Sequence, residues 1–193
     1  MSFICLAPGK EVGRAVLEAM ENCLQGTFGL PTRRLGVFPE PSVSYDSKRD
    51  QYSSSDMLQV LAAIQPPDAV RVLGITERDI FIPMLSFIFG QAQLGGRIAL
   101  ISLARLRQTF YGLPPDPELL MKRACKEAIH ELGHTFGLTH CLDQGCAMSL
   151  STAIQQVDSK AQAFCGNCRT LLHDRFKAIG MIPKDGGHAE DHT

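Results

Sequence analysis

Short apolar runs alternate with helical stripes along the first third of the chain. Residues 2–7 form an apolar run of strand length, and residues 10–24 carry apolar side chains at the spacing of one helix face. Residues 34–39 predict a second short strand, and residues 57–64 resume helical spacing. The chain therefore opens with strands and helices in alternation. Residues 39–55, rich in proline, serine and charge, predict a connection between them.

The middle of the chain predicts the centre of a sheet and then an edge. Residues 69–75 are nearly all apolar and β-branched, as in a central parallel strand that is buried on both faces. Two further apolar runs, 81–89 and 97–106, are separated by a Gly-Gly pair. They predict a hairpin-like excursion that ends in an edge strand.

The longest helical pattern covers residues 118–138. Another helix is predicted over residues 159–179, and residues 184–193 form a polar tail. The sequence contains no internal repeat and no low-complexity segment. With 193 residues, of which 45% are hydrophobic, the chain can bury one core, so residues 1–193 are interpreted as a single domain.

The balanced net charge and the lack of targeting signals limit the expected location and binding partners of the protein. Nineteen basic and twenty acidic residues give a formal charge of −1, which creates no field that would collect nucleic acid or anionic membranes. The first residues lack the basic region of a signal peptide, and no apolar stretch reaches the roughly 18 residues of a membrane span. We expect a soluble, cytoplasmic monomer that binds neither nucleic acid nor a membrane.

A histidine motif lies inside the longest helical pattern. His130-Glu131-Leu132-Gly133-His134 places two imidazoles about one turn apart on one helix face. Gly137 can take the left-handed conformation that ends a helix, so that His140 reaches the same ion. Three neutral nitrogens leave one position of a tetrahedral zinc open for a water whose pKa falls to about 7. Glu131 is the candidate general base for that water and the later proton donor to the leaving amine.

The alternative, ordinary helix histidines, is disfavoured because a glycine and a third histidine continue the register of the motif. The remaining histidines have no such neighbours and predict solvated or tail positions: His173, His188 and His192. The sequence leaves open whether the polar tail folds back onto the zinc.

Four of the seven cysteines cluster near the C-terminus. Cys141 and Cys146, followed by the CxxC pair Cys165 and Cys168, have the layout of a four-thiolate structural zinc site. Cytosolic thiols stay reduced, which favours metal over disulfides, and a dithiol redox role would leave the first pair unexplained. The remaining cysteines fall inside apolar patterns and predict small buried side chains: Cys5, Cys23 and Cys125.

Together these motifs resemble a known family. The spacing HExxHxxGxxH over residues 130–140 is the extended zinc motif of the metzincin metallopeptidases, in which a methionine turn follows below the metal. Met148 is the candidate for that methionine. The continuation through Cys141, Cys146-Ala147-Met148 and Cys165-Gly166-Asn167-Cys168 is similar to the archaemetzincin family.

The resemblance implies a metzincin-like α/β fold. We expect a twisted mixed, mostly parallel sheet with one antiparallel edge strand, for which residues 97–103 are the candidate, a long active-site helix and a C-terminal helical part with the four-cysteine zinc site. Residues 1–138 would form the upper part and residues 139–193 the lower part. An extended substrate would pair antiparallel with the edge strand, and Leu150 and its neighbours would line a side-chain pocket.

The resemblance also implies two zinc ions per chain, one catalytic and one structural, and a metallopeptidase that acts on a peptide or protein. Some metzincins place a tyrosine after the methionine turn, but this chain has none beyond Tyr111. A proteolytically weak or silent, zinc-stabilised peptide-binding protein therefore remains the alternative. The intact Glu131 favours the enzyme, because a pure binding module would need at most the histidines.

Overall fold

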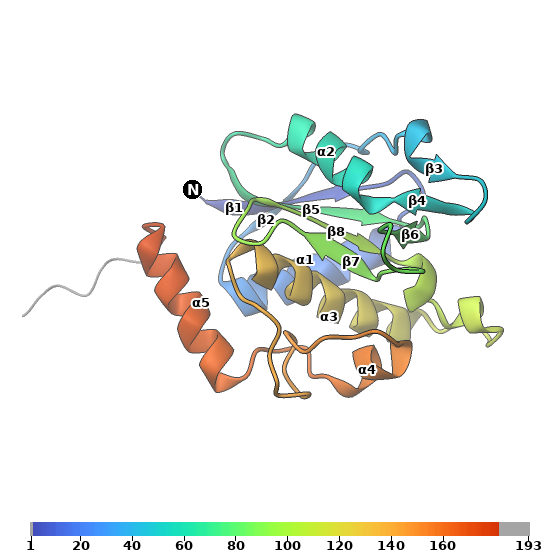
Figure 1. Ribbon diagram of the computed structural model, residues 1–193. Coiled ribbons are helices and arrows are strands. Elements are labelled where there is room, and N and C mark those ends of the chain that lie inside the picture. The colour runs from blue at the N-terminus through green and yellow to red at the C-terminus, as the bar shows by residue number, and fades with distance from the viewer. Residues whose placement is uncertain (1, 182–193) are drawn as a thin grey trace, which may run out of the picture.

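The computed structural model describes residues 2–181, which form a twisted sheet with helices on both faces (Figure 1). The main sheet has the strand order β2-β1-β5-β8-β7. Its parallel strands are β1 (Phe3–Pro8), β2 (Thr32–Arg34), β5 (Ala69–Thr76) and β8 (Ile98–Ser102). The last strand, β7 (Gly90–Ala92), runs antiparallel to β8. The predicted mixed, mostly parallel sheet is thus confirmed.

Three helices cover the two faces of this sheet (Figure 1). Helix α2 (Ser54–Ile64) packs on one face, and α1 (Arg14–Phe28) and α3 (Pro117–Thr135) pack on the other. Side chains of β1 alternate between the two cores: Ile4 and Leu6 join α1 and α3, whereas Cys5 and Ala7 join α2. This period of two is what a strand buried on both faces requires.

The prediction that residues 97–103 form the edge strand is wrong. Strand β8 pairs with β5 on one side and with β7 on the other, and all of its residues are buried. The edge is β7, whose three residues are only partly buried. The hairpin around the Gly-Gly pair exists, but its first strand, β7, and not its second strand, β8, lies at the edge of the sheet. A run of consecutive buried apolar residues such as 98–101 is typical of an interior strand.

The connection predicted over residues 39–55 contains regular structure. It holds a 3-10 turn, η1 (Ser42–Ser44), and two strands that form a second small sheet with a strand after β5. These strands are β3 (Tyr45–Asp46), β4 (Gln51–Ser53) and β6 (Ile80–Phe81). Two further 3-10 turns precede α3: η2 (Ala104–Leu106) and η3 (Gln108–Tyr111). Strands this short carry too little hydrophobic pattern to be read from the sequence.

Several boundaries also differ from the prediction. Helix α1 begins after Gly13 and continues to Phe28, and β2 overlaps the strand predicted over residues 34–39 only at Arg34. The helix predicted over residues 159–179 begins later, as α5 (Gly166–Ala178), and a separate short helix, α4 (Ile154–Ser159), precedes it. The polar tail lies outside the described residues. No helix in the described part of the chain has the length and apolar character to cross a membrane.

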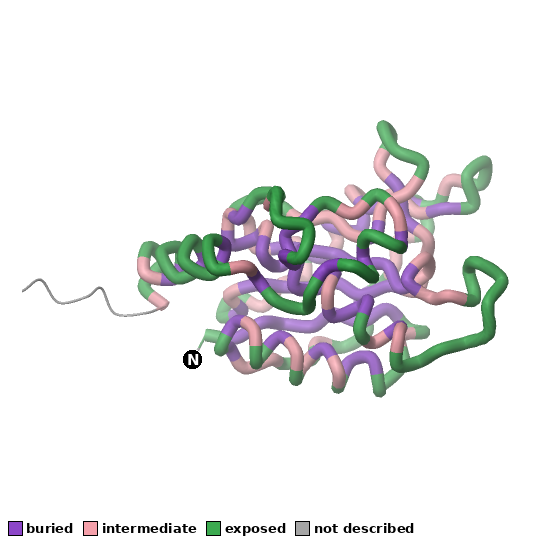
Figure 2. The backbone as a smooth tube through the Cα atoms, turned by 90° about the horizontal axis from the view of Figure 1, so that it is seen from below, coloured by how far each residue is buried: buried purple, intermediate pink, exposed green. Residues whose placement is uncertain are grey.

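Helix α3 begins and ends where its sequence dictates. The Asp116 side chain accepts the Leu119 N–H at 2.9 Å, and Pro117 occupies the first turn. At the other end Gly137 has a φ of 86°, the left-handed conformation that the motif predicts. The chain then turns towards the irregular segment before α4. Helix α5 buries only one edge against the core and is otherwise exposed (Figure 2).

Candidate active site

Three imidazoles converge at the C-terminal end of α3. His130 and His134 lie one turn apart on the helix, and His140 joins them after the turn at Gly137, with their ligand atoms within 4.8 Å of one another. The Nε2 atoms of His130 and His134 are 3.1 Å apart. Nitrogen ligands of one tetrahedral zinc, each about 2.0–2.1 Å from the metal, lie about 3.3 Å apart. The donor set and its spacing therefore fit a zinc ion.

Backbone carbonyls orient two of these rings. The Nδ1–H of His130 donates to the Ala147 carbonyl, and the Nδ1–H of His134 donates to the Leu138 carbonyl, both at 2.8 Å. Because a carbonyl can only accept, the proton lies on Nδ1 and the Nε2 lone pair is free to bind a metal. Burial lowers the pKa of all three imidazoles, which favours the neutral form that a metal requires.

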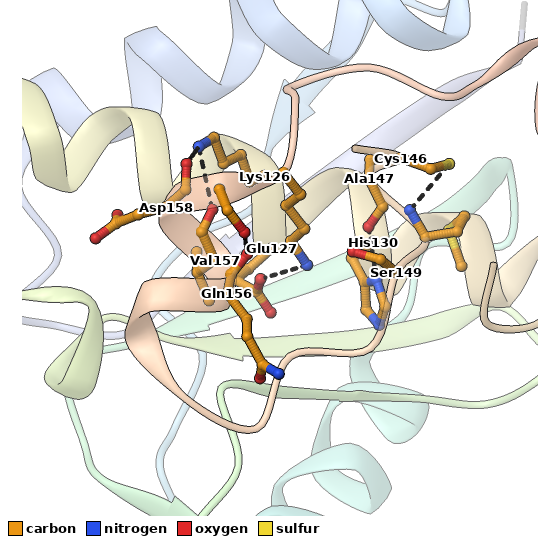
Figure 3. Close-up of polar contacts among 12 residues, drawn as sticks. Lys126, Glu127, His130, Cys146, Ala147, Ser149, Gln156, Val157 and Asp158 are labelled. Carbon is orange, nitrogen blue, oxygen red and sulfur yellow. Dashed lines mark hydrogen bonds and ion pairs between the residues drawn. The ribbon is translucent and has the colours of Figure 1, made fainter. Parts of the chain in front are cut away.

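Met148 packs directly against α3 between the two helix histidines. It is fully buried, and a Cβ on Gly133 would clash with its sulfur. The surrounding chain makes a tight turn in which the Ser149 N–H donates to the Cys146 carbonyl at 2.9 Å. This arrangement places a methionine where the sequence predicts the methionine turn. The same turn carries Ala147, so the methionine and the carbonyl that orients His130 belong to one structural unit (Figure 3).

Glu131 lies between the histidine cluster and the edge strand. Its side chain contacts the backbone of β7 at Gly90, and the residue is 5% exposed. Burial raises the pKa of this carboxyl well above its usual range, the neighbouring Glu127 carboxylate raises it further, and the Lys160 ammonium opposes both. The carboxyl group and the three histidines line the same cleft.

A cleft of about 530 Å³ opens onto this cluster. One wall is the segment around β7, including residues 85–92, a second is α3, and a third is formed by residues 150–152 after the methionine turn. The three histidines and Glu131 line the space between these walls. Leu150, predicted to line a side-chain pocket, lies in the third wall. A cleft of this size with convergent polar groups is typical of a ligand-binding site.

The four C-terminal cysteines form a second cluster. The sulfur atoms of Cys141, Cys146, Cys165 and Cys168 lie within 4.8 Å of one another, and those of Cys141 and Cys165 are 3.8 Å apart. Thiolates of a tetrahedral zinc, each about 2.3 Å from the metal, lie about 3.8 Å apart, whereas a disulfide needs about 2.05 Å. All four thiols are free. The residues therefore fit a four-thiolate zinc site.

Backbone N–H groups point at the sulfurs of this cluster. Cys146 Sγ accepts from the N–H groups of Met148 at 3.4 Å and Cys165 at 3.3 Å. The backbone N–H of Cys168 lowers the pKa of the Cys165 thiol. Such N–H bonds stabilise the thiolate form that binds metal. Cys5 and Cys125 are buried as predicted, and Cys23 is partly buried.

Comparison with known proteins identifies the family. Residues 14–174 match the model of Peptidase family M54. The archaemetzincin of Methanocaldococcus jannaschii is 42% identical over 172 residues, which span 89% of this chain and 93% of that protein. The archaemetzincin of Pyrococcus furiosus is 41% identical over 180 residues, 90% of this chain and 94% of that protein. This chain belongs to the archaemetzincin family.

A solved archaemetzincin has the same fold. The structure from Methanopyrus kandleri matches with a TM-score of 0.82 at 36% identity, covering 92% of this chain and 96% of that one. A zinc-dependent peptidase from Methanocorpusculum labreanum matches with a TM-score of 0.77 at 29% identity, covering 88% of this chain and 99% of that one. As a member of the archaemetzincin family, the chain is a zinc metallopeptidase.

The fold of this archaemetzincin brings together the three histidines and the four cysteines that the motifs single out, in two separate clusters. Sequence reasoning missed the buried Glu127 and Lys160, the unpartnered hydroxyl of Ser151 and the close approach of Gly90. Glu127 lies three residues before His130, so helical spacing could have placed it on the same face. No local pattern marks the other three, because their partners come from distant segments.

Proposed function

We propose that this archaemetzincin hydrolyses peptide bonds at the histidine cluster, with His130, His134 and His140 holding a catalytic zinc and Glu131 acting as general base. The observation that carries the proposal is that the Glu131 carboxyl and three converging imidazoles, two of them oriented by backbone carbonyls, line one open cleft. A zinc ion bound there would lower the pKa of a water to about 7 and would polarise the scissile carbonyl.

Glu131 moves the proton. Its carboxylate accepts a proton from the attacking water and then donates it to the nitrogen of the departing amine. The carboxyl can serve both steps because it is buried on α3 against β7, which holds it in one place. The carbonyls of Ala147 and Leu138 keep two of the imidazoles in the tautomer that binds metal.

The edge strand supplies the substrate groove. Among residues 2–181 strand β7 pairs only with β8, so its other side offers unpaired backbone groups to an extended peptide, which would add as an antiparallel strand. Strand β7 runs alongside α3 in the same direction: Gly90 lies at Glu131, and the Gly95 N–H donates to the His134 carbonyl at 2.9 Å. A peptide antiparallel to β7 therefore directs the residues after its scissile bond towards Glu127.

The four cysteines hold a second, structural zinc. They fasten the irregular segments on either side of α4, where the Ala147 N–H donates to the Ala163 carbonyl at 2.9 Å and the Ala161 N–H to the Gly145 carbonyl at 2.8 Å. Few regular elements stabilise this part of the chain, so a metal crosslink contributes directly to its folding. Thiolate ligands require a reducing compartment such as the cytoplasm. A single chain carries both ligand sets and Glu131, so we propose a monomer.

A peptide-cleavage assay on the zinc-loaded protein tests this function. Glu131→Ala should retain both zinc ions and lower turnover by at least about 100–10,000-fold, the contribution of a general base. The matched control is Glu118→Ala, an exposed carboxylate in the first turn of the same helix. Unchanged turnover in Glu131→Ala would exclude the assignment. Peptide binding by the wild type without any cleavage would favour the peptide-binding alternative.

A further inference from the structure

Beyond the histidines, the cleft continues into a pocket between α3 and the chain after the methionine turn. Its lining includes Glu127 on α3 and, on the facing wall, Leu150, Ser151 and Thr152. We call these four residues the carboxyl-side pocket. A substrate bound antiparallel to β7 would direct the side chain that follows the scissile bond into this pocket.

The facing wall is tied firmly to α3. Arg123 makes two hydrogen bonds of 2.7 Å with the Asp158 carboxylate. One turn further along the helix, the Lys126 ammonium donates to the backbone carbonyls of residues 157 and 158 at 3.1 and 2.8 Å (Figure 3). The Gln156 side chain accepts the Thr152 N–H at 2.6 Å. The pocket therefore has a rigid wall, which is a requirement for selecting one side chain over another.

A buried ion pair lies at Glu127. Its Oε1 atom is 2.9 Å from the Lys160 ammonium, and the two side chains are only 3% and 0% exposed. Although Glu127 Oε1 and Lys160 Nζ are this close, neither atom has a hydrogen-bond partner of normal geometry among the described residues. Lys160 engages one oxygen of this carboxylate, and Glu127 lines the pocket, so the remaining acceptor sites of the carboxylate can take a hydrogen bond from a ligand.

The opposite wall offers a second free group. The Ser151 hydroxyl oxygen is buried and also lacks a hydrogen-bond partner within the part of the chain that the structure describes. A hydroxyl can donate as well as accept. The pocket thus presents a carboxylate acceptor on α3 and a hydroxyl donor on the facing wall.

We propose that the carboxyl-side pocket selects substrates with an asparagine or glutamine directly after the scissile bond. This inference rests on the proposed peptidase function. The amide N–H would donate to Glu127, and the amide oxygen would accept from Ser151. An apolar side chain would leave both groups unpaired, and a site built to hydrogen-bond its substrate strongly rejects analogues that cannot.

The buried Lys160 ammonium disfavours charged substrate side chains in this pocket. Its ammonium neutralises the Glu127 carboxylate, so a lysine or arginine of the substrate would place a second positive charge in the same enclosed space. An acidic side chain would instead face the Glu127 carboxylate. An uncharged amide avoids both repulsions.

Peptides that differ at one position test the proposal. A quenched-fluorescence series carries glutamine, leucine, lysine or glutamate at one site in an alanine background, and mass spectrometry identifies the cleaved bond. We expect kcat/KM for glutamine after the scissile bond to exceed that for leucine by about tenfold or more. Equal or better cleavage before leucine, or a preference for lysine, would overturn the proposal.

A paired substitution tests the residues themselves. Glu127→Leu with Lys160→Met replaces the buried pair by apolar side chains of similar size, a change that is often neutral or stabilising, whereas either single change strands a buried charge. The double variant should lose the glutamine preference and favour leucine. The control pair, Glu118→Leu with Lys122→Met, removes an exposed ion pair of the same helix and should keep the preference. Retention of the glutamine preference in the Glu127 and Lys160 variant would contradict the assignment.

A binding measurement separates this inference from the proposed function. Zinc-loaded Glu131→Gln protein should bind the intact glutamine peptide about tenfold more tightly than the leucine peptide, as measured by calorimetry. If the wild type cleaves nothing while this binding difference holds, the peptidase proposal fails and the pocket assignment stands. If the wild type cleaves and neither binding nor cleavage discriminates, the pocket assignment fails alone.

Discussion

Gly90 of the edge strand faces the Glu131 carboxylate at a distance that excludes any side chain on residue 90. A Cβ there would lie 2.6 Å from both Cγ and Oε1 of Glu131. Gly90 is not among the glycines with positive φ, so space and not backbone conformation requires the glycine. The strand that would bind the substrate and the proposed catalytic base are thereby packed against each other.

Gly90→Ala should therefore damage catalysis more than folding. The added methyl group must displace the Glu131 side chain, and a shift of about 1 Å in a catalytic group can lower the rate about 100-fold. We expect kcat/KM to fall about 10–100-fold with the zinc content unchanged, as determined by peptide hydrolysis and elemental analysis. Gly36→Ala is the control, because a Cβ at that glycine meets nothing within 4 Å. Full activity in Gly90→Ala would show that the close contact is not needed.

Metal analysis should find two zinc ions per chain. Cys141→Ser should lose one of them and lower the thermal stability, because structural zinc supplies folding free energy. A loss of several kcal/mol corresponds to a decrease in Tm of roughly 10 °C or more for a domain of this size. Cys5→Ser, at a buried cysteine outside the cluster, is the control and should keep both ions. A single zinc in the wild type would refute the two-site assignment.

The two metal sites should be coupled in one direction. His140 and Cys141 are chain neighbours, and the structure adds a second link: Ala147, whose carbonyl orients His130, directly follows Cys146. Loosening the cysteine cluster should therefore disturb two histidines at once. We expect Cys165→Ser or Cys168→Ser to weaken catalytic zinc binding by about 10–100-fold, the usual effect of losing the groups that orient metal ligands.

Chelator competition can measure this coupling through the release of the more weakly bound zinc. His134→Ala is the reciprocal variant and should leave the cysteine site nearly intact, because all four thiolates remain. Folded serine variants that release the catalytic zinc as slowly as the wild type would show that the sites are independent.

Gly133→Ala should strain the methionine turn. The new methyl group would collide with the buried Met148 sulfur, and overpacking of this kind typically costs about 1–3 kcal/mol. The resulting shift of Met148 also moves the Ala147 carbonyl, so the affinity for catalytic zinc should fall together with Tm. Met148→Leu, a swap of similar volume, should cost less than about 1.5 kcal/mol. A fully stable Gly133→Ala protein would show that the turn tolerates displacement.

The sequence by itself determined the residues of both candidate metal-binding clusters. His130, His134 and the left-handed Gly137 follow from helix geometry and chain stereochemistry, so their spacing places the ligands before any tertiary contact is known. The CxxC pair is equally local. The central strand over residues 69–75 was also predictable, because burial on both faces leaves a continuous apolar run.

Only the tertiary structure decided which strand forms the edge and what lines the cleft. A three-residue strand such as β7 carries too little pattern to be recognised, and its role depends on β8 lying between it and β5. Lys160 looks like an ordinary surface lysine in the sequence, yet the fold buries it against Glu127. Gly90 lies 41 positions from Glu131 in the chain, and no local preference encodes that contact. Long-range packing, which depends on all the elements at once, sets such relationships.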